Sequence, residues 1–374
     1  MGVLIRDHLR DSVDRMDLVD HHCHGVSTVE LDDAGVESRL GEGGPPPAGR
    51  TNFDSPVGLA VRRHCAPVLD LDPHASRRDY LDRRRELGPA ELARRFLAPT
   101  GTSRFCVDTG FRPDGLTTPE QLAAFAGGRG YHVVRLETVA EELAAGGVEP
   151  GELARRYPER LAAAVAEVGA VGVKSVAAYR VGLDLDPTPP TPAEVAEAAA
   201  GWDGRRLADP VLTRMTLAAA VELGLPIQFH IGFGDSDIRM ARVDPTLLTN
   251  WLHRHRVPVM LLHCWPYQRQ AGWLASVHPH VHLDVGLALH YVGPTRAAAV
   301  LAEAAELAPF GKLLYSSDAY GLPELYFLGA LTFRRALATL LTERVGAGEW
   351  SAADATRIAR LIGHGNAESV YDLK

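Results

Sequence analysis

From residue 100 onward, short apolar runs alternate with alanine-rich amphipathic segments, and this alternation constrains the fold more than any other feature of the sequence. The pattern is typical of repeated βα units around a parallel sheet. Including one run near the N-terminus, the runs that fit strands cover residues 16–25, 104–111, 131–138, 171–179, 225–233, 257–264, 280–287 and 312–320. Eight strands with helices between them favour a closed (β/α)8 TIM-like barrel of the α/β class over an open sheet.

The interval between the first two predicted strands is much longer than the later ones, which indicates an insertion after the first strand. It contains the Gly/Pro-rich stretch 41–50, which predicts a loop, and charged segments at 79–88 and 89–98, which predict helices. We therefore expect residues 31–100 to form a helical cap over one end of the barrel. On this interpretation residues 1–374 form a single domain.

Three later helices are predicted from the residues at which they begin. The segments PEQLAAFA, PVLTRMTLAAAVELG and PTLLTNWLHRH start at Pro119, Pro210 and Pro245, each directly after a cap residue. Proline suits the first turn of a helix because a backbone N–H at that position has no partner within the helix.

Charge and hydropathy exclude two classes of partner. The formal net charge is -8 and no basic run is longer than Arg83–Arg85, so nucleic acid is not expected to bind. No signal-peptide core and no run of about 18 apolar residues occurs, so we expect no membrane partner and a cytoplasmic location. The four cysteines form no CxxC pair and are expected to be reduced. A small-molecule substrate is the expected partner, and the sequence leaves open whether the protein forms a homo-oligomer.

Residues that can bind a metal stand at the ends of four predicted strands. In the first strand, His22 and His24 lie two residues apart, so both point to one face and can share an ion, whereas His21 is expected to point to the other face. The fifth, sixth and eighth strands end in further candidates, which are His230, His263 and Asp318. Because the carboxyl ends of barrel strands meet at one mouth, these side chains are expected to form a single metal site.

Four motifs surround these candidates: HHCH in the first strand, QFHIGFGDSD in the fifth, LLHCW in the sixth and YSSDAYG in the eighth. Together they resemble the amidohydrolase superfamily of metal-dependent hydrolases. With VVRLET, VKSVAAYRVGL and GNAESVYDL, the chain is most similar to amidohydrolase-like domains related to the N-terminal part of nodulin/glutamine-synthetase fusion proteins. The resemblance extends over residues 16–373, is weak in the insertion, and implies a (β/α)8 barrel with one or two divalent ions.

The number of ions depends on Lys174 in the fourth predicted strand. In the superfamily a lysine at this place is commonly carbamylated and bridges two ions, whereas an ordinary lysine would form an ion pair or anchor substrate. The two-ion arrangement that the resemblance implies has His22, His24 and Asp318 on one ion, His230 and His263 on the other, and Lys174 between them. In the one-ion alternative, the ion binds His22, His24, His230 and Asp318, and His263 forms a hydrogen bond. Zinc is the expected metal, with manganese or iron as alternatives.

The resemblance implies hydrolysis of an amide or related C–N bond by metal-activated water. A divalent ion lowers the pKa of bound water from about 15.7 toward about 7, so hydroxide is the expected nucleophile. Asp318 is expected to accept its proton and pass it to the leaving amine, and His263 or the metal is expected to hold the oxyanion. γ-Glutamyl-type amides are the substrate class that the resemblance suggests.

Substrate contacts are predicted from residues just beyond the strands. Arg180 follows the fourth strand and is expected to bind a substrate carboxylate, with an ion pair to Asp184 or Asp186 as its alternative role. The other expected substrate contacts are Tyr179, Glu137 and His290.

Two other functions fit the same set of ligands. Non-oxidative decarboxylases of carboxylated aromatics resemble this pattern, and in those lyases the metal binds the substrate. A non-catalytic, metal-stabilised scaffold is the other alternative. The intact ligand set argues against the scaffold.

Overall fold

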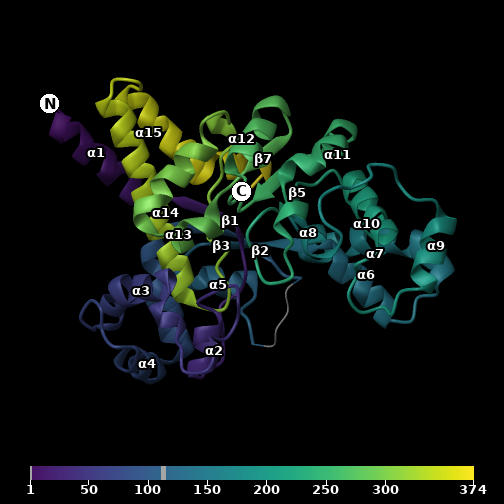
Figure 1. The fold of residues 1–374 in the computed structure, drawn as a ribbon, viewed down its shortest axis with the longest axis horizontal. Helices are drawn as coiled ribbons and strands as arrows, with labels where there is room; N and C mark the ends of the chain where they lie inside the picture. Colours follow the sequence, from purple (N-terminus) through teal and green to yellow (C-terminus); the bar gives the residue numbers. More distant parts are fainter. Residues whose placement is uncertain (1, 111–114) are drawn as a thin grey trace.

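The computed structural model describes residues 2–110 and 115–374 of the chain. A curled parallel sheet, with its strands in chain order, lies at the centre of the molecule (Figure 1). Each strand pairs with the next in parallel. The strands are β1 (Leu18–Cys23), β2 (Thr102–Asp108), β3 (Arg129–Arg135), β4 (Gly172–Ser175), β5 (Ile227–His230), β6 (Val259–Leu262) and β7 (Val281–Leu283).

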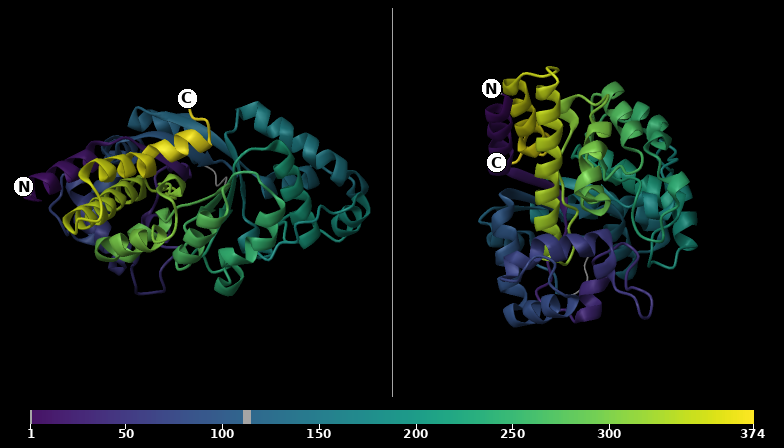
Figure 2. Two further views of the ribbon diagram at one scale, coloured as in Figure 1. Left: turned by 90° about the horizontal axis from the view of Figure 1, so that it is seen from above. Right: turned by 60° about the vertical axis from the view of Figure 1, so that its left-hand side comes forward.

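Helices lie around the outside of this sheet, as the two views in Figure 2 show. The helices are α1 (Gly2–Arg15), α2 (Asp33–Ser38), α3 (Pro56–Ala60), α4 (Arg77–Leu97), α5 (Pro119–Ala126), α6 (Leu136–Ala145), α7 (Leu153–Val168), α8 (Ala177–Arg180), α9 (Pro192–Ala200), α10 (Pro210–Leu223), α11 (Thr249–Arg254), α12 (Gln268–Val277), α13 (Gly286–Ala304), α14 (Pro323–Gly346), α15 (Ala352–Arg360) and α16 (Asn366–Val370). In the described part of the chain, no helix is both long enough and apolar enough to span a membrane.

Seven of the eight predicted strands are present, each shorter than the apolar run that predicted it. The run 131–138 ends in the first turn of α6, and the run 171–179 ends in α8. Phe111, the predicted end of the second strand, lies outside the described residues. The observed sheet and helices make an α/β fold of the TIM-barrel type.

The prediction of a regular eighth strand at residues 312–320 is wrong. In the described chain this segment forms one isolated bridge, between Leu313 and Leu283 of β7. Its backbone still links the two edges of the sheet, because the Leu314 N–H donates to the Leu283 carbonyl (3.0 Å) and the His21 N–H donates to the Tyr315 carbonyl (3.1 Å).

Side chains and backbone geometry explain why segment 312–320 is irregular. The Ser317 N–H donates to the Asp20 carboxylate (2.9 Å) instead of a neighbouring strand. Asp318 has φ = 50°, in the left-handed region, which a β-strand cannot include. The segment therefore crosses from β7 to β1 without forming a regular ladder.

Two of the three predicted helix starts are confirmed in full. α5 begins after Thr118, whose side chain forms a capping box with Gln121, and α10 begins after Asp209, whose carboxylate accepts two backbone N–H groups. The third predicted helix, 245–255, is divided into a 3-10 turn over Pro245–Leu248 followed by α11.

The chain between β1 and β2 contains α2, α3 and α4, which lie together beside α14 (Figure 1). The predicted helical segments 79–88 and 89–98 are the two halves of α4, which is kinked at Gly88 (φ = 73°) in front of Pro89. Apolar side chains of this region, including Phe53 and Phe96, form one buried cluster with residues of β2 and α14.

Candidate metal centre

Three side chains from opposite ends of the chain meet beyond the carboxyl end of β1. The Nε2 atoms of His22 and His24 lie 3.0 and 3.5 Å from the same oxygen of Asp318. Ligand atoms of all three residues lie within 4.8 Å of one another. Within residues 2–110 and 115–374, no other histidine, cysteine, aspartate or glutamate group of three or more has this geometry. These three side chains could therefore hold a metal ion.

The hydrogen bonds behind His22 orient it for metal binding. The Gln228 amide nitrogen donates to the His21 carbonyl (2.8 Å), and a carbonyl can only accept, so the Gln228 amide oxygen must face His22. That oxygen lies 2.9 Å from His22 Nδ1, which therefore carries the ring proton. The lone pair of His22 is left on Nε2, the atom beside Asp318, and histidine ligands in metal sites have this arrangement.

His24 is held in the same way. Its Nδ1 lies 3.4 Å from the Asp108 carbonyl oxygen, which can only accept, and its Nε2 faces Asp318. The Asp108 side chain in turn accepts two hydrogen bonds from Arg135 (3.1 and 2.5 Å). The ion pair with Arg135 keeps Asp108 and its backbone carbonyl in place behind His24.

His230 and His263 also present ring nitrogens to this centre. His230 Nε2 and both ring nitrogens of His263 are buried without a hydrogen bond to the described part of the chain, and the two rings lie 4.7 Å apart. A buried polar atom without a partner costs about 1–3 kcal/mol, so binding of a metal ion by these nitrogens would remove a cost to the folded state. Burial lowers the pKa of both histidines, which keeps their rings neutral and able to bind a metal. The residues present fit a divalent ion.

The backbone at two of the candidate ligands is strained. His263 and Cys264 directly follow β6 with φ values of 69° and 57°, and Asp318 has φ = 50°. Residues other than glycine rarely adopt this region, and such strain is frequent at functional sites. The Asp284 carboxylate stabilises the turn, since it accepts the N–H groups of His263 (3.0 Å) and Gly286 (2.7 Å).

Asp318 is charged in this environment. Burial alone would raise the pKa of its carboxyl, but the neighbouring His263, His22 and His24 hold that pKa well below its usual range. His263 Nε2 lies 3.6 Å from the second oxygen of Asp318. The carboxylate is therefore placed between the His22 and His24 pair and His263.

A cavity of about 270 Å³ opens above these residues. All six predicted metal ligands line it, including Lys174, whose pKa burial lowers to about 8. Loops beyond the strands complete the wall with residues that include Glu42, Tyr179, Arg180, Arg206, Asp237 and Tyr320. A volume of this size suits a small molecule.

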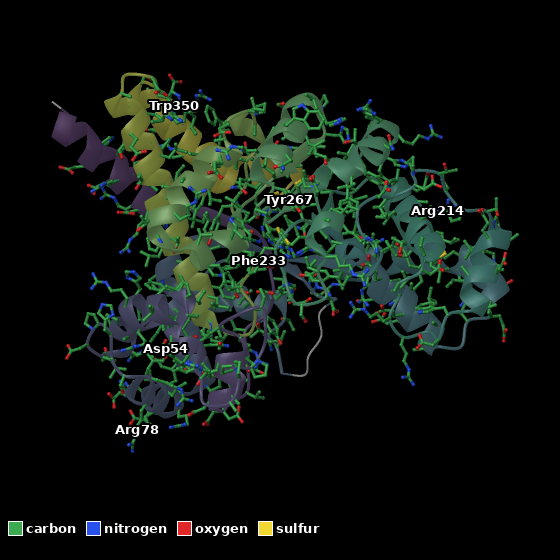
Figure 3. All side chains as sticks on the ribbon, viewed as in Figure 1. Asp54, Arg78, Arg214, Phe233, Tyr267 and Trp350 are labelled. Carbon is green, nitrogen blue, oxygen red and sulfur yellow. The ribbon has the colours of Figure 1, made fainter. Side chains whose placement is uncertain are left out.

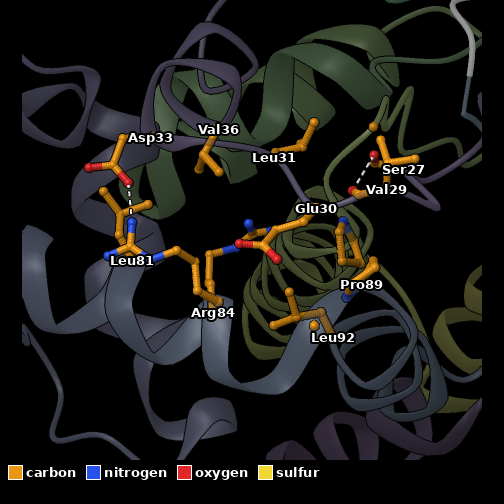
Figure 4. A pocket seen from close by; sticks show the side chains of 14 residues that line it. Ser27, Val29, Glu30, Leu31, Asp33, Val36, Leu81, Arg84, Pro89 and Leu92 are labelled. Atoms are coloured by element: carbon orange, nitrogen blue, oxygen red, sulfur yellow. Dashed lines mark hydrogen bonds and ion pairs between the residues drawn. The ribbon is translucent and has the colours of Figure 1, made fainter.

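A second, smaller cavity lies between α4 and the chain after β1 (Figure 4). Its volume is about 20 Å³, which is close to the space of one water molecule. The Arg84 guanidinium at its wall is already bound by both carboxylate oxygens of Glu324 (2.5 and 3.2 Å). This cavity has no room for a substrate.

The structure brings two of the four predicted substrate contacts to the large cavity. Tyr179 lines it and its hydroxyl lies 3.3 Å from His230 Nδ1. Arg180 lines it as well, and among residues 2–110 and 115–374 its Nε and Nη1 atoms, both buried, have no hydrogen-bond partner. An ion pair of Arg180 is present, but with a different carboxylate from the ones expected: Glu141 lies 3.7 Å from Arg180, and Asp186 pairs with Arg214, at the right of Figure 3.

Glu137 and His290 are not among the residues that line this cavity. One oxygen of Glu137 accepts hydrogen bonds from the Ser175 hydroxyl (2.8 Å) and the Val176 N–H (3.0 Å), so Glu137 fixes the end of β4. His290 is buried in α13, where burial lowers its pKa to about 4. The sequence placed both residues near the right strands but could not give the direction of their side chains.

Sequence reasoning missed Gln228 and Glu42. Gln228 lies two residues before His230, so the alternation that pairs His22 with His24 could have found it. Glu42 carries no comparable signal, because it stands in the Gly/Pro-rich loop. It accepts a hydrogen bond from the Tyr291 hydroxyl (3.1 Å), and Tyr291 packs on Phe233 at the centre of Figure 3.

Comparison with known families agrees with this geometry. A model of the amidohydrolase family matches residues 128–373, about two-thirds of the chain. The chain belongs to the amidohydrolase family. The predicted resemblance to the amidohydrolase superfamily is therefore confirmed, and membership implies an enzyme that uses a divalent metal.

Three individual proteins are similar to this amidohydrolase in sequence or in structure. It is 32% identical over 238 residues to protein fluG of Emericella nidulans, an alignment that covers 59% of this chain but only 27% of fluG. Its structure is similar to that of a protein described as a metal-dependent hydrolase from Lactobacillus casei, with a TM-score of 0.83 and 28% identity over 97% of each chain. A uronate isomerase from Bacillus halodurans shares the fold, with a TM-score of 0.68 and 14% identity over 100% of this chain and 97% of the isomerase.

Proposed function

We propose that this amidohydrolase cleaves an amide or related C–N bond of a small carboxylated substrate, with γ-glutamyl-type amides as the first class to test. The observation that carries the proposal is the His22, His24 and Asp318 group, which opens into a cavity where Arg180 has unpartnered donors. A carboxylate is the natural partner for a guanidinium with two donor nitrogens that lack a hydrogen bond to the described residues.

The proposed cofactor is zinc, with manganese or iron as alternatives, in a two-ion site. His22, His24 and Asp318 would hold one ion, His230 and His263 the other, and carbamylated Lys174 would lie between them. A divalent ion at such a site supplies water of lowered pKa and a positive charge beside the scissile carbonyl. The buried, neutral histidines and the position of Lys174 in the cavity wall support this arrangement.

Each side chain then has a defined task. The Asp318 carboxylate accepts the proton of the attacking water and delivers it to the leaving amine, since its low pKa keeps it unprotonated before the reaction. In the two-ion arrangement the positive charge of the metal would stabilise the developing oxyanion, whereas in the one-ion alternative His263 would donate a hydrogen bond to it. Arg180 holds the substrate carboxylate and so positions the carbonyl carbon.

The test combines metal analysis with hydrolysis of γ-glutamyl amides. Protein purified without chelator and with bicarbonate present is expected to contain two ions per chain, and Lys174→Ala to contain one. Short carboxylates added to Lys174→Ala should restore part of its activity. Wild-type protein with one ion that releases carbon dioxide from carboxylated aromatics, and does not hydrolyse the amides, would replace this proposal with the decarboxylase alternative.

Arg180→Gln tests the substrate carboxylate separately. Losing a buried, charged hydrogen bond costs about 2–5 kcal/mol, so kcat/KM for an acidic amide should fall roughly 30-fold to several-thousand-fold. The methyl ester of the same amide is the control, because it has no carboxylate to lose. An equal fall on the acid and on the ester would mean that Arg180 does not bind the carboxylate.

A further inference from the structure

A second hollow, of about 410 Å³, adjoins the cavity of the metal centre. The two spaces share Tyr179, Arg180, Arg206 and Asp237 in their walls, so they lie side by side. The outer hollow adds Arg239 and Arg242, which gives it four arginines against one carboxylate. We call Arg180, Arg206, Arg239 and Arg242 the arginine vestibule.

The loops after β4 and β5 build the arginine vestibule and are fastened to each other. The Leu183 N–H donates to the Arg242 carbonyl (2.9 Å), and the Arg242 guanidinium donates to the Val181 carbonyl. Gly182 between them has φ = 86°, and a Cβ at this position would lie 3.0 Å from Arg242 Nε. Only glycine lets the two loops approach this closely, so the vestibule is a formed feature of the fold.

The charges of the arginine vestibule are incompletely compensated. Asp237 pairs with Arg206 at 2.7 Å, and the Glu141 carboxylate lies 3.7 Å from Arg180. Arg239 is exposed and has no ion pair with any residue that the structure describes. Arg180 lines both spaces, and its Nε and Nη1 atoms are buried without a hydrogen bond to any described residue. An anion that enters the hollow would meet an excess of positive charge.

We propose that the arginine vestibule binds a second acidic group of the substrate, a carboxylate or a phosphate, so that the enzyme selects dianionic substrates. This inference rests on the proposed function, in which Arg180 holds the first carboxylate. Since the two spaces share four wall residues, a substrate whose two acidic groups contact both would gain, in its second contact, from the high effective concentration that the first provides. Arg239, which forms no ion pair with a described residue, is the residue expected to discriminate a second acidic group from a neutral one.

Binding of simple acids to the metal-loaded protein tests the proposal without knowledge of the natural substrate. Calorimetry at low ionic strength would compare glutarate and adipate with valerate and hexanoate, the monocarboxylates of equal carbon number. The dicarboxylates are expected to bind more tightly, and Arg239→Gln to weaken them by about three- to ten-fold while leaving the monocarboxylates unchanged. Arg239→Lys should keep most of the preference because it keeps the charge.

Arg254→Gln is the matched control, because Arg254 is an exposed arginine that precedes β6, at the opposite end of the strands. It should leave both affinities unchanged. Dicarboxylates that bind wild type and Arg239→Gln equally would overturn the proposal. The proposal would also be overturned if the binding of inorganic phosphate depended on Arg239 but did not compete with glutarate, because the hollow would then be a separate anion site.

Failure of the proposed function would look different. An enzyme that hydrolyses no C–N bond, yet binds dicarboxylates in a way that depends on Arg239, would overturn the hydrolase proposal and keep the preference for dianions. If the enzyme hydrolyses acidic amides and Arg239→Gln changes neither affinity, the hydrolase proposal stands and the preference for dianions is overturned.

Discussion

At the scale of single residues, the candidate metal centre depends on groups that do not touch the ion position. Gln228 is the clearest case, because its amide is locked between the His21 carbonyl and the Tyr371 hydroxyl, both 2.8 Å from its nitrogen. The amide oxygen then fixes the tautomer of His22. A residue with no metal-binding atom in the cavity therefore decides which nitrogen of a ligand is available.

Replacing Gln228 with leucine should weaken metal binding. The change removes the acceptor for His22 Nδ1 at similar volume, and loss of such a supporting hydrogen bond typically lowers metal affinity about 10- to 100-fold. Competition with a fluorescent chelator measures the effect. Metal-free Gln228→Leu must keep the circular dichroism spectrum of wild type, and an unchanged affinity would contradict the role given to Gln228.

Glu42 should make the stability of the metal-free protein depend on pH. Burial and the negative charge of Asp318 raise the pKa of Glu42 to about 7 in the folded protein. In the unfolded chain this pKa is near 4.5. Between these values the folded state binds more protons, so the contribution of Glu42 to stability falls as pH rises from about 4.5 to about 7. Asp235 also raises this pKa, whereas the Tyr291 hydroxyl and His24 lower it.

Glu42→Gln removes this titration. Urea unfolding of chelator-treated protein should show that the variant gains stability relative to wild type between pH 5 and pH 8. A difference that is the same at both pH values would mean that Glu42 ionises normally. Asp237→Asn is a useful control, because Asp237 is an exposed carboxylate of the same cavity wall.

At the scale of elements, the apolar runs located seven strands because buried parallel strands are continuously hydrophobic. The eighth run has the same composition at its start, in Lys312–Tyr315, but Ser316, Ser317 and Asp318 use their polar groups and a left-handed φ for the site. Amino-acid composition cannot show that these three residues serve the site instead of extending a strand. Likewise, the sequence predicted helices at 79–88 and 89–98, but not that they continue through a kink at Gly88.

A buried ion pair joins α4 to α14 and gives a prediction at this scale. Arg84 binds both oxygens of Glu324, and the Tyr80 hydroxyl donates to the same carboxylate (3.0 Å). Arg84→Met leaves Glu324 buried beside a single neutral donor, so the free energy of unfolding should fall by about 3–5 kcal/mol. Denaturant titration measures the loss.

The double variant Arg84→Met with Glu324→Leu is the matched comparison. Because it removes both charges and keeps apolar volume, it should be more stable than Arg84→Met alone. If the double variant were less stable than the single one, the ion pair would contribute through packing and not through charge.

At the scale of the whole molecule, the candidate site could be predicted because barrel topology brings strand ends together. His22 and Asp318 stand near opposite ends of the sequence, yet their side chains are 3.0 Å apart. The cavity residues that the sequence did not predict come from loops. Glu42 and Arg206 line the cavity, but they stand in segments without the regular apolar pattern that locates strands and helices. The treatment of residues 1–374 as a single domain with an inserted cap at 31–100 stays a prediction.

Metal removal should loosen the junction between β1 and segment 312–320. An ion on His22, His24 and Asp318 binds the folded state alone, and a ligand present at 1,000 times its Kd adds about 4.1 kcal/mol of stability. Chelation should therefore lower Tm and raise hydrogen exchange at Tyr315–Asp318. The His22→Ala variant should have the lower Tm even without chelator, and adding chelator should not lower it further. If chelator left the Tm of the wild type unchanged, the metal would have no stabilising role.

The distance along the chain between His22 and Asp318 also has a consequence during synthesis. A nascent chain that has left the ribosome only as far as β7 already carries four of the candidate histidines but lacks the carboxylate that lies between them. The Asp318 turn emerges after every strand, so the centre can be completed only when the sheet is ready to be bridged. Binding of the ion held by His22, His24 and Asp318 would then show that translation has passed residue 318, and truncated chains would be released without that ion.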